Sequence, residues 1–377
     1  MMQPPAQDEL EISVFGPGYG ECILVHVGHG VWLAIDSCID SRTRRSAPLD
    51  YLNAINVDPA VAIEMIVASH WHDDHVRGLH DLLVAAKRAR FSCSFALTGK
   101  EFVSLAKIYS SKQSKIPSGP EELYRCLETV RDRQQQTGSV HHRWATIDKV
   151  LCQTEVGQPI NFSLTALSPS DQMLSRTHQF MIDYLNAVKN GHSEPRLVPG
   201  CPNDVAVALL LEISGRQVIF GSDLEQEPNQ FVGWSAVMTS ETIKASGKAC
   251  VFKVAHHGAI SGHSDQVWND LLVNSPLALL TPFRHGNLRI PTQADRERIL
   301  RETDQAYISA SPNGSVKVPR KASKVQAFVD GTVKNRRLAN GRMGQIRWRA
   351  SLSNAQDAGR VALFGEALAL SDVTEAG

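Results

Sequence analysis

The chain has 377 residues and a mass of 41.4 kDa, and 42% of its residues are hydrophobic, which is enough for one large folded domain or two ordinary ones. Its 39 Lys and Arg residues balance its 39 Asp and Glu residues, so long-range electrostatic attraction of nucleic acid is excluded and any polyanion site must be local. The seven cysteines form no CxxC pair, the N-terminus lacks the pattern of a signal peptide, and no window is apolar enough for a membrane span, so we expect a cytoplasmic protein without disulfides and without membrane contact.

The N-terminal part predicts a meander of strands followed by a strand-to-helix turn. Strand-like runs at 11–15, 22–27 and 31–36 are separated by the glycine-rich turns GPGYGE and GHG. A buried strand is predicted at 64–69, and the apolar residues after it recur at helical spacing, at Val76, Leu79, Leu82, Leu83 and Ala86. The segment HWHDDH, residues 70–75, is therefore predicted to lie between a strand and a helix.

The middle of the chain alternates between polar helical segments and apolar strands. Residues 99–136 and 171–190 predict helices, with a break at 118–120, and we interpret them as a helical insertion. Further elements are predicted as strands at 161–168, 205–214, 216–223, 249–258 and 276–283, and as helices near 264–272 and 292–303.

The stretch from Ser315 to Ala350 is strongly basic, with ten Lys and Arg residues and a single acid, Asp330. It is either an arm that contacts phosphate groups or a solvated surface segment that ends in a short strand at 344–350. On the first interpretation, the residues expected to bind phosphate include Lys317, Arg320, Lys321, Lys324, Arg336 and Arg337.

The histidine-rich turn has the spacing of a metal site. His70 and His72 lie two residues apart, which on an extended chain puts both imidazoles on the same side, where they can bind one ion. Asp74 and His75 follow where the backbone turns into the helix, so they can address a second ion. Imidazole and carboxylate ligands without thiolate favour an open, catalytic site for Zn, Mn or Fe.

Three more predicted strands end in residues of metal-binding type. Asp36 closes the third strand, Asp223 follows VIFGS, and His256 and His257 follow CVFKVA. Asp223 is a candidate for the carboxylate that bridges two metal ions. Core packing does not predict such residues at the ends of four strands, so we expect them to form one site.

These motifs resemble those of the metallo-β-lactamase superfamily. HWHDDH is similar to its HxHxDH signature, and Asp36, residues 70–75 and Asp223 occur in the order of its motifs. Within the superfamily, GPGYGE, Asn203, GSD and KVAHHG resemble the DNA-uptake ComEC-type branch. The resemblance spans roughly residues 10–310 and implies an αββα sandwich, in which two β-sheets pack face to face between helices, with a dinuclear metal site at one edge.

The resemblance divides the chain into a metallo-β-lactamase-like domain at 1–314, with the helical insertion near 99–190, and a basic C-terminal extension and tail at 315–377. It implies that His70 and His72 hold one metal ion, that Asp74, His75 and one histidine of the HHG motif hold the other, and that Asp223 bridges them. Of that pair, we expect His256 to be the ligand and His257 to be a proton donor. Asp36 is expected to orient a ligand imidazole.

The sequence also departs from the superfamily pattern. The third histidine of the first metal site has no clear counterpart, and Asn203 or Asp204 stands near its place as a possible ligand or substrate contact. Arg77 replaces a glycine next to the signature, where it either meets a substrate phosphate or lies on the helix surface.

Two divalent metal ions, Zn²⁺ or Mn²⁺, lower the pKa of a bridging water, so we expect a hydrolase. A phosphodiesterase or nuclease that acts on DNA or RNA is favoured, with Asp74, His257 and Asp36 as catalytic residues. One alternative is a metallohydrolase for a small substrate such as a cyclic nucleotide, a thioester or a lactam. A second alternative is a binding or regulatory module that holds metal without catalysis. The sequence specifies no protein partner.

Overall fold

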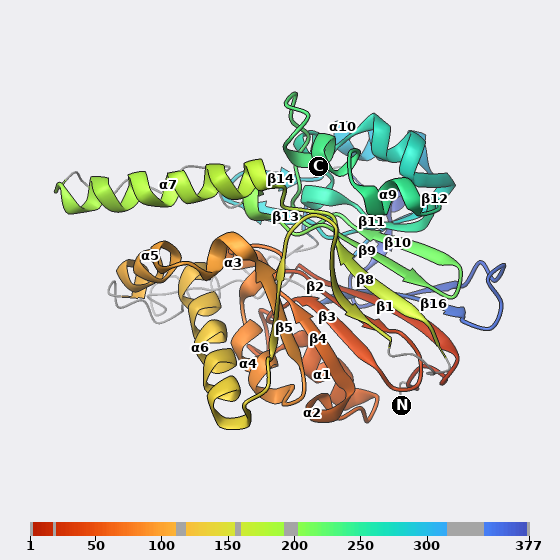
Figure 1. Ribbon diagram of the computed structural model, residues 1–377. Coiled ribbons are helices and arrows are strands. Elements are labelled where there is room, and N and C mark those ends of the chain that lie inside the picture. The colour runs from red at the N-terminus through yellow and green to blue at the C-terminus, as the bar shows by residue number, and fades with distance from the viewer. Residues whose placement is uncertain are drawn as a thin grey trace, which may run out of the picture.

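The computed structural model describes residues 3–17, 20–110, 118–154, 160–191, 203–314 and 343–374. Two eight-stranded sheets pack face to face, and helices cover their outer faces (Figure 1). The αββα sandwich expected from the sequence is therefore confirmed.

The first sheet is antiparallel on one side of β3 and parallel on the other. In spatial order its strands are β17 (Arg360–Phe364), β16 (Gly344–Ser351), β1 (Glu9–Gly16), β2 (Cys22–His26), β3 (Trp32–Asp36), β4 (Ile63–Val67), β5 (Arg90–Ser94) and β6 (His142–Ala145).

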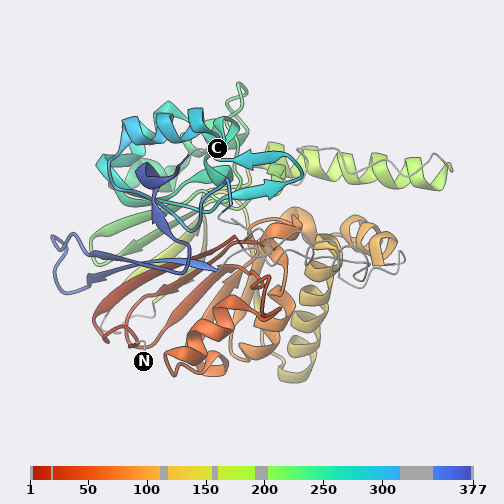
Figure 2. The ribbon, with the colours of Figure 1, turned by 180° about the vertical axis from the view of Figure 1, so that it is seen from behind.

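The second sheet also has parallel strands next to an antiparallel set, and a further antiparallel strand lies at its other edge. Its strands are β18 (Leu368–Ala369), β15 (Ala306–Ile308), β12 (Leu272–Leu280), β11 (Ala249–Lys253), β10 (Arg216–Phe220), β9 (Leu209–Ile213), β8 (Phe162–Ala166) and β7 (Lys149–Gln153). A separate hairpin of β13 (Phe283–His285) and β14 (Leu288–Ile290) is visible from behind in Figure 2.

Each sheet carries its own helices. The first sheet is covered by α1 (Ala47–Ala54), α2 (Pro59–Ala62), α3 (Asp73–Val76), α4 (Leu79–Ala85) and α6 (Gly119–Thr137), and the second by α8 (Gly233–Val237), α9 (Glu241–Ala245) and α10 (Gln293–Glu302). Two helices, α5 (Lys100–Ser110) and α7 (Asp171–Lys189), project to one side in Figure 1. Single helical turns complete the described elements: η1 (Phe95–Thr98), η2 (Asn203–Val205), η3 (Ala255–Gly258), η4 (Ile260–Gly262), η5 (Val267–Leu271) and η6 (Leu370–Asp372).

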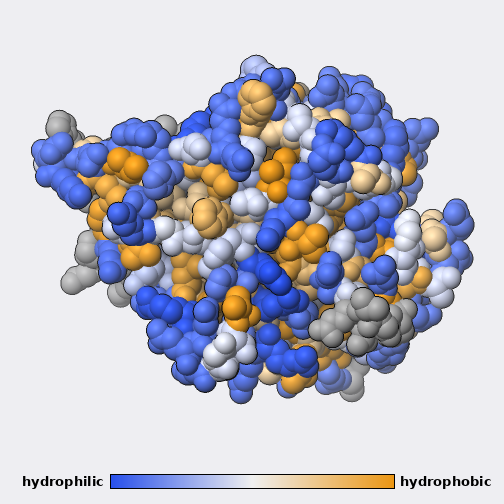
Figure 3. Space-filling view, viewed as in Figure 1, coloured by the Kyte–Doolittle hydropathy of each residue, from blue (hydrophilic) through white to orange (hydrophobic). Residues whose placement is uncertain are grey.

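The apolar residues form three layers, one between the sheets and one under each set of helices. Every residue of β2 and β3 is buried, because both faces of these strands are covered. This explains why the strands read as continuous apolar runs and not as alternating patterns. The face in Figure 3 is largely hydrophilic, with hydrophobic residues in small scattered patches.

The expected domain boundary at residue 314 needs correction. β16 pairs with β1, β17 pairs with β16, and β18 pairs with β15 of the second sheet, so the chain from 343 to 374 is part of the sandwich and not a tail. The expected helical insertion near 99–190 also contributes β6, β7 and β8 to the sheets. None of the helices in the described ranges combines the length and the apolar character needed to cross a membrane.

Candidate metal centre

The candidate ligands gather where parallel strands of both sheets end. β3 runs parallel to β4, and β10 runs parallel to β11, so each pair delivers its C-terminal ends to one edge of its sheet. Asp36 is the last residue of β3, and the turn at 70–75 follows β4. Asp223 and the pair at 256–257 follow β10 and β11. These residues therefore lie together at one edge of the sandwich.

One group of side chains, which we call site 2, consists of Asp74, His75, His257 and Asp223. The Nε2 atom of His75 lies 3.4 Å from Oδ1 of Asp223 and 3.9 Å from Oδ2 of Asp74. The Nε2 atom of His257 lies 3.3 Å from Oδ2 of Asp74 and 3.7 Å from Oδ2 of Asp223. Two imidazoles and two carboxylates therefore face the same point.

A second group, site 1, consists of His70, His72 and Asp223. The Nε2 atom of His70 lies 3.0 Å from Nδ1 of His72 and 3.7 Å from Oδ2 of Asp223. Asp223 belongs to both groups and lies between them, in the position expected of a bridging carboxylate.

The donor atoms of site 2 fit a divalent cation. Nε2 of His75, Nε2 of His257 and Oδ1 of Asp223 are buried, and none of them has a hydrogen-bond partner within the described part of the chain. Buried polar atoms without partners are rare and costly, and here they point toward one another. Imidazole nitrogens and carboxylate oxygens are ordinary ligands of Zn²⁺ and Mn²⁺, so the residues present fit such ions.

The charges of the cluster also favour a cation. Burial alone would lower the pKa of His75, but four surrounding carboxylates raise it well above its usual range: Asp223, Asp36, Glu21 and Asp74. Burial would raise the pKa of the Asp223 carboxyl, yet His75 and His257 hold it well below its usual range. At His70, burial is the dominant influence and lowers the pKa of the imidazole, which keeps it neutral and able to bind metal.

Asp36 orients two of the histidines. Its Oδ2 atom accepts a hydrogen bond from Nδ1 of His75 at 2.7 Å and one from the Ser69 hydroxyl at 2.6 Å, and its Oδ1 atom accepts the Ser69 backbone N–H at 2.7 Å. The Ser69 hydroxyl in turn lies 3.0 Å from Nδ1 of His70. With their Nδ1 atoms engaged, both imidazoles turn Nε2 toward Asp223.

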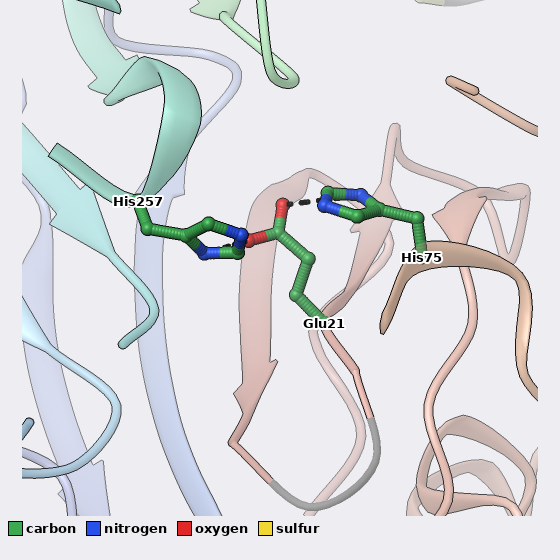
Figure 4. Close-up of side chains that lie close together, drawn as sticks. All are labelled: Glu21, His75 and His257. Atoms are coloured by element: carbon green, nitrogen blue, oxygen red, sulfur yellow. Dashed lines mark ion pairs between the residues drawn. The ribbon is translucent and has the colours of Figure 1, made fainter. Parts of the chain in front are cut away.

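Glu21 is a member of the centre that the sequence analysis missed. Figure 4 shows its carboxylate between the rings of His75 and His257, at 4.0 Å from Nδ1 of the first and 3.5 Å from Nδ1 of the second. Its Oε2 atom pairs with the Lys253 ammonium at 3.0 Å and accepts a hydrogen bond from the Thr281 hydroxyl. Burial would raise the pKa of Glu21, but Lys253 and the two histidines lower it.

Glu21 lies on the Nδ1 side of both rings, behind the faces that meet at site 2. Nδ1 of His75 already donates to Asp36, and the ammonium of Lys253 already balances the charge of Glu21. This side of the rings is therefore closed to a further cation. The backbone N–H of Glu21 donates to the carbonyl of Asp74 at 2.8 Å, which fixes the turn that carries both site 2 residues of the signature.

The structure places the two histidines of the HHG motif in the opposite order to the one expected. His257 is buried in site 2, whereas the His256 side chain is 21% exposed, with Nδ1 at 3.0 Å from Oε1 of Glu225 and 2.8 Å from the Ser261 hydroxyl. Nε2 of His256 lies 4.0 Å from Oδ2 of Asp223. His256 is therefore at the rim of the centre. Both histidines adopt positive φ, at 47° and 54°, so the backbone turns sharply after β11 and brings the later residue inward.

Other expected contacts lie outside the cluster. Both carboxylate oxygens of Asp204 accept hydrogen bonds from Arg176 on α7, at 2.5 and 2.8 Å, so Asp204 is not a free ligand. The side-chain amide of Asn203 donates to Glu225 at 3.1 Å. The Arg77 guanidinium pairs with the Asp73 carboxylate at 2.6 Å, and the Arg77 side chain is 22% exposed.

The expected phosphate-binding residues of the basic stretch lie outside the described residues: Lys317, Arg320, Lys321, Lys324, Arg336 and Arg337. Two other basic residues of that stretch, Arg347 and Arg349, have partners within the first sheet. Arg347 stacks over the ring of Phe364 at 4.6 Å, and Arg349 is buried against Glu11. These two arginines belong to β16 and not to an arm.

No protein-family model and no curated protein matches the chain. Solved structures that resemble it have the metallo-β-lactamase fold. MEM-A1, a subclass B3 metallo-β-lactamase from a soil metagenome library, is 14% identical, with 68% of this chain and 80% of that chain covered and a TM-score of 0.33. The metallo-β-lactamase fold protein YhfI from Bacillus subtilis is 14% identical, with 65% and 70% covered and a TM-score of 0.32. The metallo-β-lactamase SMB-1 is 12% identical, with 71% and 87% covered and a TM-score of 0.34.

Proposed function

We propose that this chain is a metal-dependent hydrolase that binds two divalent cations, Zn²⁺ or Mn²⁺. The observation that carries the proposal is the convergence of buried imidazole and carboxylate atoms that have no other partner in the described part of the chain. When bound, two such ions supply a water of lowered pKa and positive charge for the transition state of hydrolysis.

The side chains of the centre have distinct roles in this proposal. His70, His72 and Asp223 would hold one cation, and Asp74, His75, His257 and Asp223 would hold the other. Asp36 keeps a proton at Nδ1 of His75 and thereby directs the Nε2 lone pair to site 2. His256 has a carboxylate partner at Nδ1 and turns Nε2 toward Asp223, which is the geometry of a group that passes a proton to a leaving oxygen.

We further propose a phosphodiester as the substrate, with DNA or RNA as the first candidates. The support is the similarity of GPGYGE, HWHDDH and KVAHHG to the motifs of the ComEC-type branch. Two adjacent cations would also suit a phosphodiester, because they would supply positive charge to its non-bridging oxygens.

The proposal is tested with metal-stripped protein to which Mn²⁺, Zn²⁺ or Mg²⁺ is returned. Labelled single-stranded and double-stranded DNA, RNA, a cyclic dinucleotide and a chromogenic phosphodiester are the substrates, and bound metal is counted in parallel. The inactive variant is His72→Ala/Asp74→Ala. The matched control is His178→Ala/Asp81→Ala, because both of its side chains are exposed on helices away from the centre.

Cleavage by the wild type and by the control, but not by the inactive variant, is the expected result. Cleavage of small esters alone would replace nucleic acid by a small substrate. Two bound ions without any turnover would leave a binding module, and failure to bind any ion would overturn the metal centre itself.

A further inference from the structure

Two chains of hydrogen bonds hold histidines of the centre. Each chain runs from a carboxylate through a hydroxyl to the Nδ1 atom of a histidine. In the first chain, the Ser69 hydroxyl donates its proton to Oδ2 of Asp36 at 2.6 Å. The oxygen of Ser69 can then only accept from Nδ1 of His70, 3.0 Å away. A carboxylate at one end thus determines, through a hydroxyl, which ring nitrogen of the histidine carries the proton.

The second chain starts at Glu21 in place of Asp36. The hydroxyl of Thr281, the residue that follows β12, donates to Oε2 of Glu21, and its oxygen lies 3.2 Å from Nδ1 of His257. The carbonyl of Thr281 lies 3.3 Å from the same nitrogen and is also an acceptor. Both groups therefore require the proton of His257 on Nδ1, which leaves the lone pair of Nε2 directed at Asp74 and Asp223.

Lys253 fixes the starting point of this second chain. Its side chain is completely buried at the end of β11, and its ammonium lies 3.0 Å from Oε2 of Glu21. A buried ammonium without a counter-charge is very costly, so the pair keeps Glu21 in the form that can only accept hydrogen bonds. Glu21, Lys253, Thr281 and His257 come from four separate segments of the chain, and all four side chains are buried.

We propose that Glu21, paired with Lys253, acts through Thr281 as a positioning residue that sets the tautomer and ring orientation of His257, as Asp36 does through Ser69 for His70. We call the chain from Glu21 through Thr281 to His257 the relay. This inference rests on the proposed function, because in that proposal His257 is a metal ligand. Without the carboxylate, the Thr281 hydroxyl can donate to Nδ1 of His257 instead. The ring proton then moves to Nε2, where it faces Asp74 and Asp223 and occupies the metal position.

The experiment compares Thr281→Val, which keeps the shape of the side chain but removes the hydroxyl, with Thr281→Ser, which keeps the hydroxyl. Glu21→Gln tests the carboxylate. The matched control is Thr303→Val, because Thr303 is also buried and its hydroxyl donates to the carbonyl of Pro276, away from the centre. Thermal unfolding of each metal-free variant shows which of them fold.

Two measurements follow on the folded variants. Nitrogen-15 NMR of labelled histidine reports the tautomer of His257 in the metal-free protein, with His257→Gln to assign the signal. Competition with a chelator reports the affinity for the second equivalent of Zn²⁺ or Co²⁺. We expect the wild type, Thr281→Ser and Thr303→Val to keep the proton on Nδ1. Glu21→Gln frees the Thr281 hydroxyl to donate to Nδ1 and is expected to shift the proton toward Nε2. Thr281→Val removes one of the two acceptors at Nδ1 but keeps the Thr281 carbonyl, so it is expected to give a smaller shift in the same direction. Both variants are expected to lower the affinity for the second ion, Glu21→Gln roughly tenfold.

Equal tautomer populations and equal affinities in Thr281→Val and Thr281→Ser would overturn the relay. If the wild type bound no second ion, the proposed function would fail, but the tautomer measurement on metal-free protein would still decide whether the relay exists. The two failures are therefore distinguishable.

Discussion

Replacing Gly20 by alanine tests how the close approach of Gly20 to Asp74 supports the metal centre. Gly20 has a φ of +116°, and a Cβ atom built on it would lie far inside contact distance of the Asp74 carbonyl. The positive φ costs an alanine about 1–2 kcal/mol. Relief of the overlap separates Gly20 from Asp74 and breaks the hydrogen bond from the Glu21 N–H, which costs about 1 kcal/mol more. We expect a total loss of about 2–3 kcal/mol in the free energy of unfolding and, because Asp74 and His75 move, roughly tenfold weaker metal binding.

Gly138→Ala is the control for this substitution. Gly138 also has a positive φ, of 70°, but nothing lies within 4 Å of its Cβ position, and it closes α6 at the surface. Urea unfolding of metal-free protein and chelator competition give the two quantities for each variant. We expect Gly138→Ala to lose about 1 kcal/mol and to bind metal like the wild type. If Gly20→Ala lost no more stability than Gly138→Ala and bound metal equally well, close approach of Gly20 to Asp74 would not support the site.

Three further predictions concern the frame of the centre and its ions. Glu11 is fully buried and accepts hydrogen bonds from Nε of Arg349 at 2.7 Å and from the Tyr51 hydroxyl at 2.6 Å. Glu11→Gln removes the nearest counter-charge of the Arg349 guanidinium, which keeps Glu9 at 3.6 Å, so we expect a cost of about 1.5–3 kcal/mol in urea unfolding. The double variant Glu11→Leu/Arg349→Met should recover most of this, and a loss as large as in Glu11→Gln would contradict the reasoning. Burial lowers the pKa of His26 to about 4, below its unfolded value, so the stability contributed by its neutral form is present above about pH 6.5 and is lost as the pH falls toward 4. Between about pH 7.5 and pH 4.5 the loss is about 2.5 kcal/mol, and His26→Gln should lack this part of the pH dependence, whereas identical pH profiles would refute the assignment. Zn²⁺ at a free concentration a hundredfold above its dissociation constant should raise the free energy of unfolding of the wild type by about 2.7 kcal/mol and should leave His72→Ala/Asp74→Ala unchanged, and an equal rise in both would place the ion elsewhere.

The strands and the signature turn could be predicted because their signals are local. β3 and β4 are buried on both faces, so each is a short apolar run followed by polar residues. The period of two in an extended chain is enough to put His70 and His72 on one side before any tertiary contact is known. Since parallel strands end at the same edge, Asp36 and Asp223 could also be placed near the turn.

The C-terminal part could not be predicted in the same way, because its charges are neutralised by distant residues. Arg347 and Arg349 alternate with apolar residues in β16, which is the pattern of a strand, but ten cations in one stretch also indicate a solvated arm. The decisive partner of Arg349 is Glu11 in β1, more than 300 residues away in the sequence. Neither the guanidinium nor the carboxylate indicates a buried position without the other.

The order of the two histidines in the HHG motif depends on backbone geometry that residue type does not specify. On a chain that continued the extended path of β11, the residue nearer the strand would reach the site first. His256 and His257 both adopt positive φ, which is uncommon for residues with a Cβ atom. The chain turns back there and buries the later histidine, while Glu225 and Ser261 hold the earlier one at the rim.

Lys253 is the one signal in the sequence from which Glu21 could have been found. CVFKVA places a lysine inside an apolar strand between parallel neighbours, where an ammonium cannot remain without a counter-charge. Its partner must be a carboxylate at the same edge of the sandwich. Two carboxylates at that edge, Asp36 and Asp223, already contact the imidazole of His75. Glu21 ends the glycine turn that leads to this edge, so a search for the counter-charge of Lys253 reaches the residue that a search for metal ligands passes over.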